Sequence, residues 1–107
     1  MFRVEDTDWP RIVRLYDALL GVWDSPVVAL NRAVAVSFAT GPAPALELVD
    51  QLAHDGRLSS YAYLPATRAH LLRELGRHQE ADSADARALT LTRNPAEQLL
   101  LRTRLSG

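Results

Sequence analysis

The sequence contains neither cysteine nor lysine, and none of its apolar stretches is long enough to cross a bilayer. Without cysteine, the chain can form neither a disulfide framework nor a thiolate zinc site. No secretory signal peptide is recognisable, so we expect a cytoplasmic location without membrane attachment. The exclusive use of arginine as the basic residue, beside abundant Ala and Leu, is typical of a GC-rich genome and does not by itself indicate phosphate binding.

The chain also lacks an excess of positive or negative charge, because 13 acidic residues balance 12 basic ones and the formal net charge is −1. Proteins that grip nucleic acid neutralise phosphates with a basic face. We therefore expect no direct DNA binding by this chain. Its 107 residues, 48% of them hydrophobic, suffice for one small domain with a modest core.

Arrangements typical of catalysis are absent as well. No serine lies in a G-x-S-x-G turn, and no glycine-rich phosphate loop occurs. His70 and Glu74 have the spacing of a metal-binding pair, as have His78 and Asp82, but such pairs are common on solvated helices. The sequence therefore predicts a protein that is not an enzyme and that binds neither a metal nor a cofactor.

Apolar residues recur at intervals of three and four along almost the whole chain, which is the helical period. The exception is the segment 57–64, which suits either a strand or a helix start. Proline and capping residues mark helix starts near Pro10, Pro26 and Pro95. We expect an all-α fold with helices at about residues 8–22, 25–40, 43–54, 61–76, 78–92 and 95–105.

Small residues repeat at a fixed interval within two neighbouring segments of the chain. An alanine pair twelve residues apart, interrupted by a glycine, occurs twice. Close helix crossings accept only small side chains, so this interval indicates one repeated helical hairpin. The two pairs are Ala33 with Ala45 and Ala69 with Ala81. We predict three antiparallel hairpins stacked with a right-handed twist.

The second hairpin resembles a tetratricopeptide repeat. Small or apolar residues stand where that motif places them, at Ala69, Leu72, Gly76, Ala81, Ala88 and Leu89. Two features depart from the motif: Asp85 replaces the usual aromatic residue, and the closing proline comes late, at Pro95.

A longer resemblance covers about residues 6–105. The chain reads DTDWPRIVRLYDALL, SPVVALNRAVAV, GPAPALELVDQL and YAYLPATRAHLLRELGRHQEA in turn. These strings resemble the C-terminal extension of a subgroup of bacterial RNA polymerase sigma factors of the extracytoplasmic-function (ECF) type. SPVVALNRAVAV, at residues 25–36, is the most distinctive of them.

The resemblance implies a tetratricopeptide-like regulatory domain that modulates transcription initiation through protein contacts. Its partners would be the promoter-recognition regions of the sigma factor, RNA polymerase or a regulator. The promoter-recognition regions themselves are not recognisable in these 107 residues. We expect the C-terminal part of a longer sigma factor; the alternative is a free-standing tetratricopeptide-like adaptor that binds a peptide of another cytoplasmic protein.

Polar residues inside apolar segments are the candidates for partner binding. Asn31 and Arg32 interrupt the most apolar helix, and Arg68 occupies the matching position of the next hairpin. An unpaired buried guanidinium is costly, so Arg32 needs a carboxylate, for which Asp17 is the expected partner, or a groove. One interpretation is an internal ion pair that fixes hairpin register. The other is that Asn31, Arg32 and Arg68 project into a concave, peptide-binding face.

Aromatic residues form the remaining candidates. Tyr61 and Tyr63 could line the same groove or belong to the core. Trp9 and Trp23 are expected to anchor the packed face of the first helix. That helix is terminal in this chain, so part of its apolar face could remain exposed. We therefore predict a sticky edge near Trp9 and a dimer through it.

Overall fold

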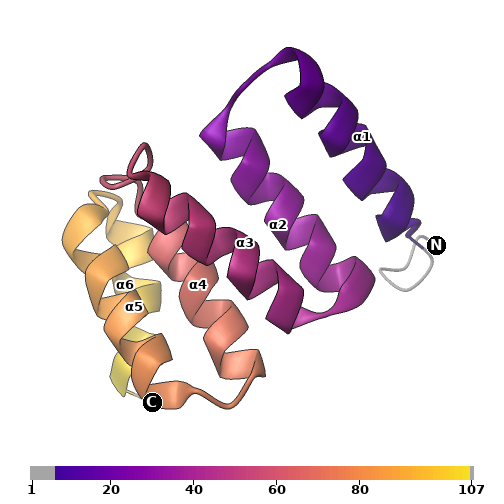
Figure 1. The fold of residues 1–107 in the computed structure, drawn as a ribbon. Coiled ribbons are helices and arrows are strands. Elements are labelled where there is room, and N and C mark those ends of the chain that lie inside the picture. The colour runs from indigo at the N-terminus through magenta and orange to yellow at the C-terminus, as the bar shows by residue number, and fades with distance from the viewer. Residues whose placement is uncertain (1–6, 107) are drawn as a thin grey trace.

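The computed structural model describes residues 7–106 as an all-α fold. Its six helices run in antiparallel succession and confirm the predicted helical-hairpin class (Figure 1). Each boundary lies within two residues of the predicted one. The helices are α1 (Trp9–Val22), α2 (Pro26–Thr40), α3 (Pro42–Asp55), α4 (Tyr63–Glu74), α5 (His78–Leu91) and α6 (Pro95–Ser106).

Capping side chains start three of the helices as the sequence predicts. The Asp8 carboxylate accepts the backbone N–H of Arg11 at 3.1 Å, and the Ser25 hydroxyl accepts that of Val28 at 3.2 Å. Asn94 does the same for Ala96 at 2.9 Å. A proline follows in the first turn of each helix, where its missing N–H costs nothing.

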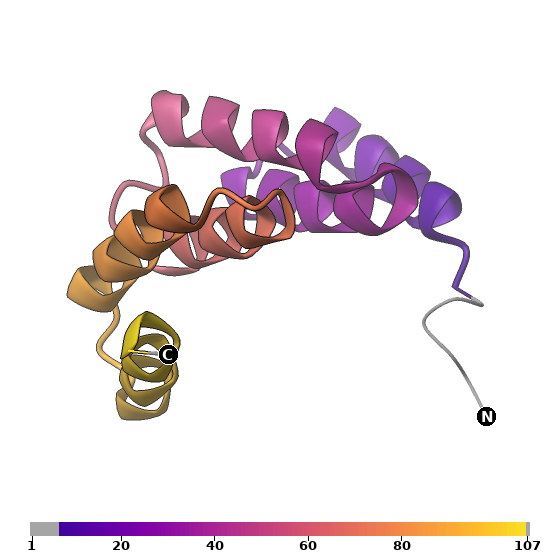
Figure 2. The same ribbon diagram turned by 90° about the horizontal axis from the view of Figure 1, so that it is seen from below.

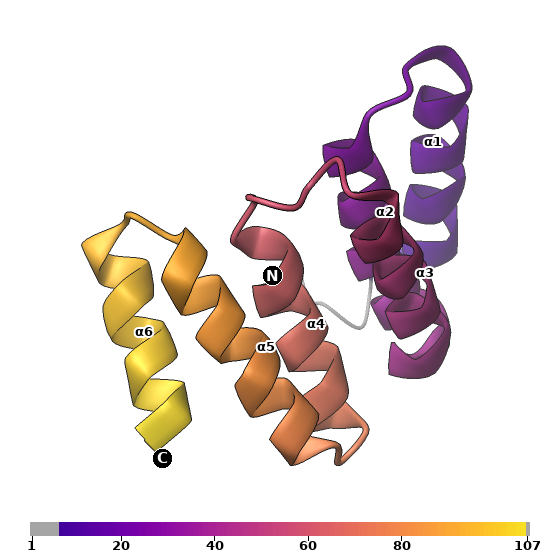
Figure 3. The ribbon, with the colours of Figure 1, turned by 60° about the vertical axis from the view of Figure 1, so that its left-hand side comes forward.

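Helices alternate between two layers. Each helix packs against its neighbours in the chain, and α2 also contacts α4. Seen from below, α3 lies on one side of α2 and α4, while α6 lies on the other side (Figure 2). The even-numbered helices therefore form the inner, concave layer. Figure 3 shows α5 between α4 and α6.

Small residues fill the centre of the stack, as their spacing predicts. The four alanines of the repeated interval are fully buried. Beside them the core contains larger aliphatic side chains with at most 1% exposure, namely Leu30, Val49, Leu71 and Leu72. Close approach of the helices at alanine is thus what holds α2 to α3 and α4 to α5.

The ambiguous segment 57–64 contains no strand: it is a turn that leads into the start of α4. Residues 57–60 form a turn after Gly56, whose φ of 84° suits glycine. Leu58 enters the core from this turn at 7% exposure, and Pro65 is buried in the first turn of α4.

The prediction that Trp9 and Trp23 anchor a packed face was wrong for Trp23. Helix α1 is strongly amphipathic, yet none of its residues is buried, and Trp23 is 58% exposed. Trp9 is half-buried and stacks on Phe38 of α2 with ring centroids 4.5 Å apart. The physical reason is position: within residues 7–106, α1 packs against α2 and no other helix covers its outer side.

Candidate functional site

A groove opens on the concave face between the three inner helices. Its volume is about 330 Å³, and its walls come from α2, α4 and α6 together with Ala62 just before α4. Its lining is mainly apolar. We call this the concave groove, lined by Val34, Ser37, Phe38, Ala62, Tyr63, Ala66, Thr67, His70, Leu71, Glu97, Leu100, Leu101 and Arg104.

Large apolar side chains stand exposed along this groove. Phe38 is 52% exposed, Tyr63 46% and Leu100 57%, and each comes from a different helix. Apolar side chains that are exposed together around one hollow indicate an interaction surface. Single exposed apolar residues are, in contrast, scattered over most protein surfaces. Water covers this area in the isolated chain, so a partner that displaces it gains hydrophobic free energy.

Polar groups of the groove mostly have partners within the protein. His70 Nε2 lies 2.6 Å from Glu74 Oε1, one turn along α4. Glu97 accepts the hydroxyl of Thr92 at 2.5 Å, where the chain enters α6. Of the lining residues, only His70 and Arg104 are basic, and Arg104 is paired with Asp85, so the groove has no cluster of basic side chains that could bind phosphates.

Of the predicted partner-binding residues, Tyr63 lies in the groove and two others lie beside it. Tyr61 meets Tyr63 edge to face, with ring centroids 6.1 Å apart. Asn31 is half-buried. It lies on the same face of α2 as Val34 and Phe38, because residues three and seven positions apart share a helix face. The concave face thus retains Asn31, Tyr61 and Tyr63 as candidates.

The hypothesis that Arg32 and Arg68 project into the concave face was wrong. Arg32 Nε bonds Asp17 Oδ1 of α1 at 2.5 Å, and Arg68 Nε bonds Asp50 Oδ1 of α3 at 2.7 Å. Arg68 follows the groove residue Thr67 by one position, which turns its side chain about 100° around the helix. The predicted Asp17–Arg32 ion pair is confirmed, and both arginines join neighbouring layers instead.

A third arginine, which the sequence reasoning missed, continues this pattern. Arg104 follows Arg68 by the same 36 residues that separate Arg68 from Arg32. It lies on α6 and bonds Asp85 Oδ1 of α5 at 2.5 Å. Each of the inner helices α2, α4 and α6 is thus joined by one Arg–Asp pair to the outer helix that precedes it in the chain. We call each of these pairs an Arg–Asp clasp. Extending the repeat interval by one more unit would have found Arg104.

Asp85 differs from its two counterparts because it is completely buried. Its carboxylate also bonds Arg73 of α4, so it joins α4, α5 and α6. Burial lowers the pKa of Arg73, but bonds and charges from Asp85 and Asp82 outweigh this and raise the pKa above its ordinary value. Arg73 therefore stays charged. An ion cluster replaces the aromatic residue that the tetratricopeptide motif has here.

Helix α1 presents a second apolar surface on its outer side. Three of its large side chains and the following tryptophan are exposed: Leu15 at 60%, Leu19 at 38%, Val22 at 86% and Trp23 at 58%. An exposed apolar edge is therefore present on α1, but it lies between Leu15 and Trp23 and not near Trp9, where the sequence predicted it. The dimer through this edge stays a prediction.

Within residues 7–106, no group of three or more His, Asp or Glu side chains is placed to hold a metal ion. None of the helices in that range is both long and apolar enough to cross a membrane.

No model of a protein family matches this chain, and no solved structure matches it significantly. It is similar to an uncharacterized protein of Rhizobium meliloti (strain 1021), with 48% identity over 103 residues. These residues make up 96% of this chain but 24% of the relative. The chain therefore spans about a quarter of the length of the curated relative that it matches.

Proposed function

We propose that this domain is the C-terminal regulatory extension of an ECF-type RNA polymerase sigma factor. It modulates transcription initiation in the cytoplasm by binding the sigma promoter-recognition regions or the polymerase. The four sequence strings at residues 6–81 support the assignment to the sigma factor. The match to a segment of a much longer Rhizobium protein is consistent with a module inside a larger chain.

The concave groove is the observation that carries the proposed protein contact. Three inner helices expose apolar side chains toward one hollow, and polar groups there such as His70 and Glu97 already have partners within the chain. Grooves of this kind bind peptides or helices through a few buried apolar anchors. The ligand on this face is therefore a segment of protein, and the domain itself has no catalytic role.

Two adjacent leucines of α6 offer a matched test of this contact. Leu100 lines the groove at 57% exposure, whereas Leu99 is 67% exposed and lies outside the groove lining. Removing a leucine that a partner buries costs about 1.5–3 kcal/mol. We expect Leu100→Ser to weaken binding to purified sigma promoter-recognition regions or core polymerase by about tenfold or more.

Leu99→Ser is the control, since it makes the same chemical change at an exposed position of α6 outside the groove lining. It should leave the dissociation constant, measured by calorimetry or fluorescence anisotropy, unchanged within about twofold. Equal losses in both variants would contradict a contact through the concave groove.

The native size of the protein separates this function from the free-standing adaptor. An antibody against the domain should detect a band several times larger than 11.8 kDa in the host. A band near 11.8 kDa would favour the adaptor and count against the sigma factor extension.

A further inference from the structure

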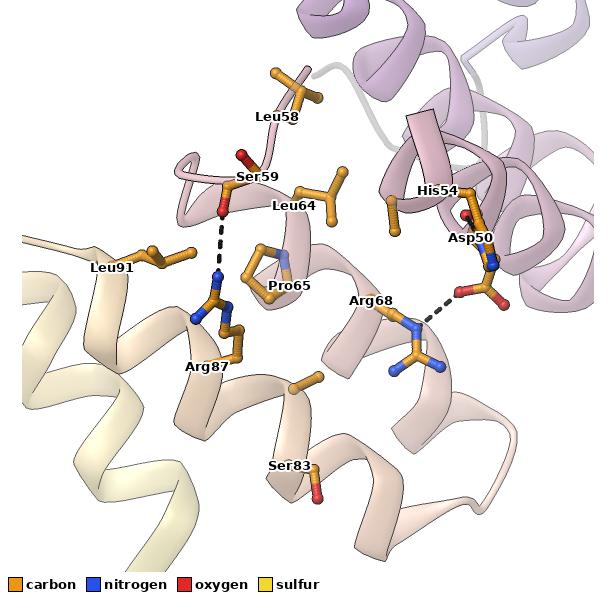
Figure 4. A pocket seen from close by; sticks show the side chains of 12 residues that line it. Asp50, His54, Leu58, Ser59, Leu64, Pro65, Arg68, Ser83, Arg87 and Leu91 are labelled. Carbon is orange, nitrogen blue, oxygen red and sulfur yellow. Dashed lines mark hydrogen bonds and ion pairs between the residues drawn. The ribbon is translucent and has the colours of Figure 1, made fainter. Parts of the chain in front are cut away.

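A second hollow lies on the opposite side of α4 from the concave groove. It occupies about 550 Å³ between α3, α4, α5 and the turn that precedes α4. This volume is within the usual range of small-molecule sites. We call it the outer pocket. Its chemistry is mixed: apolar walls from Leu58, Leu64, Pro65 and Leu91, and basic groups from Arg68 and Arg87 (Figure 4).

The two arginines keep hydrogen-bond donors available. Asp50 engages Arg68 through its Nε atom, and the two terminal nitrogens turn away from that carboxylate (Figure 4). Arg87 Nη2 reaches the backbone oxygen of Ser59 at 3.4 Å, beyond the usual range of a strong bond. Asp50 supplies one negative charge against two guanidinium charges, so the lining is attractive to an anion.

The preceding unit contains an equivalent hollow that serves as an internal comparison. It lies between α1, α2 and α3 and occupies about 360 Å³. Shifting its lining by 36 residues places Ala29 on Pro65, Arg32 on Arg68, Leu48 on Ala84, Gln51 on Arg87 and Asp55 on Leu91. The arginine of the clasp is thus common to both hollows.

Three replacements change the character of the outer pocket. Ala84 opens space that Leu48 occupies in the first unit, which agrees with the larger volume. Arg87 adds a positive charge where the first unit has neutral Gln51. The third replacement is the apolar Leu91 at the position where the first unit has the acidic Asp55. All three favour an anion with an apolar body, and a structural clasp alone requires none of them.

We propose that the outer pocket binds a carboxylate attached to an apolar body. The planar forks of Arg68 and Arg87 match a carboxylate, which accepts two parallel N–H bonds from a guanidinium. The apolar body lies on the wall formed by Leu64, Pro65 and Leu91. Both a free small carboxylic acid and the C-terminus of a peptide ending in an apolar residue carry this chemistry.

Titration of the isotope-labelled domain, followed by NMR, tests this assignment. Octanoate should shift resonances of the outer pocket saturably, while octanol and inorganic phosphate should bind at least tenfold more weakly. A short peptide ending in leucine distinguishes the two sources: tighter binding than octanoate indicates a chain terminus, and weaker binding a free acid. Both outcomes support the carboxylate site.

Two variants introduce the residue of the first unit at the matching position and should impair binding to the outer pocket. Arg87→Gln should weaken octanoate binding by about tenfold or more, and Ala84→Leu should fill the hollow. The control Gln51→Ala changes the equivalent position of the first unit and should leave binding intact. Circular dichroism melting checks that each variant folds, and Arg87→Gln keeps the test valid if Ala84→Leu does not.

Equal binding of octanoate and octanol, unchanged binding by Arg87→Gln, or no saturable shift would overturn the proposal. Leu100→Ser, which impairs only the concave groove, should bind octanoate normally. Failure of the outer pocket is thus distinguishable from failure of the proposed protein contact.

Discussion

Asp85→Ala is expected to destabilise the domain more than loss of either of its counterparts. The buried carboxylate holds Arg73 of α4 and Arg104 of α6, and Arg104 Nε is already buried without a hydrogen-bond partner. Removing one member of a buried ion cluster leaves charge uncompensated, at a cost of about 3–5 kcal/mol. We expect about 3 kcal/mol, because Arg73 and Arg104 remain partly exposed to water.

Asp17→Ala provides the matched comparison. Asp17 belongs to the first Arg–Asp clasp, but its side chain is 53% exposed. Exposed ion pairs contribute about 0–1 kcal/mol, so this variant should unfold almost like the wild type. Urea denaturation of both variants measures the difference. Similar midpoints for the two would show that burial of Asp85 is not what makes its cluster important.

Ala69→Leu is expected to have the other large effect on stability. Ala69 is fully buried on α4, which packs against α2, α3 and α5. Inserting a larger side chain into a packed core typically costs about 1–3 kcal/mol. We expect the upper end, because helices on several sides prevent α4 from shifting. The measurement is again the free energy of unfolding in urea.

Ala86→Leu controls for the chemistry of that change. Ala86 is exposed on α5, and alanine and leucine have similar helix propensities. This variant should remain within about 0.5 kcal/mol of the wild type. If Ala69→Leu were equally harmless, the repeated alanine interval would not mark close helix crossings.

The helices could be predicted because their signals are local. Asp8, Ser25 and Asn94 precede prolines, and each capping residue needs only its own first turn to act. The segment 57–64 was ambiguous because its start depends on a tertiary contact: Leu58 turns into the core and fixes the entry into α4. The sequence of the segment by itself does not reveal this contact between Leu58 and the core.

The candidate sites were only partly predictable. Repeat spacing correctly paired Arg32 with Arg68, but it could not decide which face of the inner helices they occupy. That face follows from the acids opposite them, Asp17 and Asp50, which lie 15 and 18 residues away in the sequence. The exposure of Trp23 likewise depends on which helices pack against α1, and in the described part of the chain α2 alone does so, which periodicity cannot reveal.

Site-specific photocrosslinking in the host tests the central claim most directly. A benzoylphenylalanine placed at position 100, in the concave groove, should form an ultraviolet-dependent adduct with the sigma promoter-recognition regions or with polymerase subunits, as identified by mass spectrometry. The same group at position 99 should give little of that adduct. Adducts with unrelated cytoplasmic proteins alone, or equal adducts from both positions, would contradict the account.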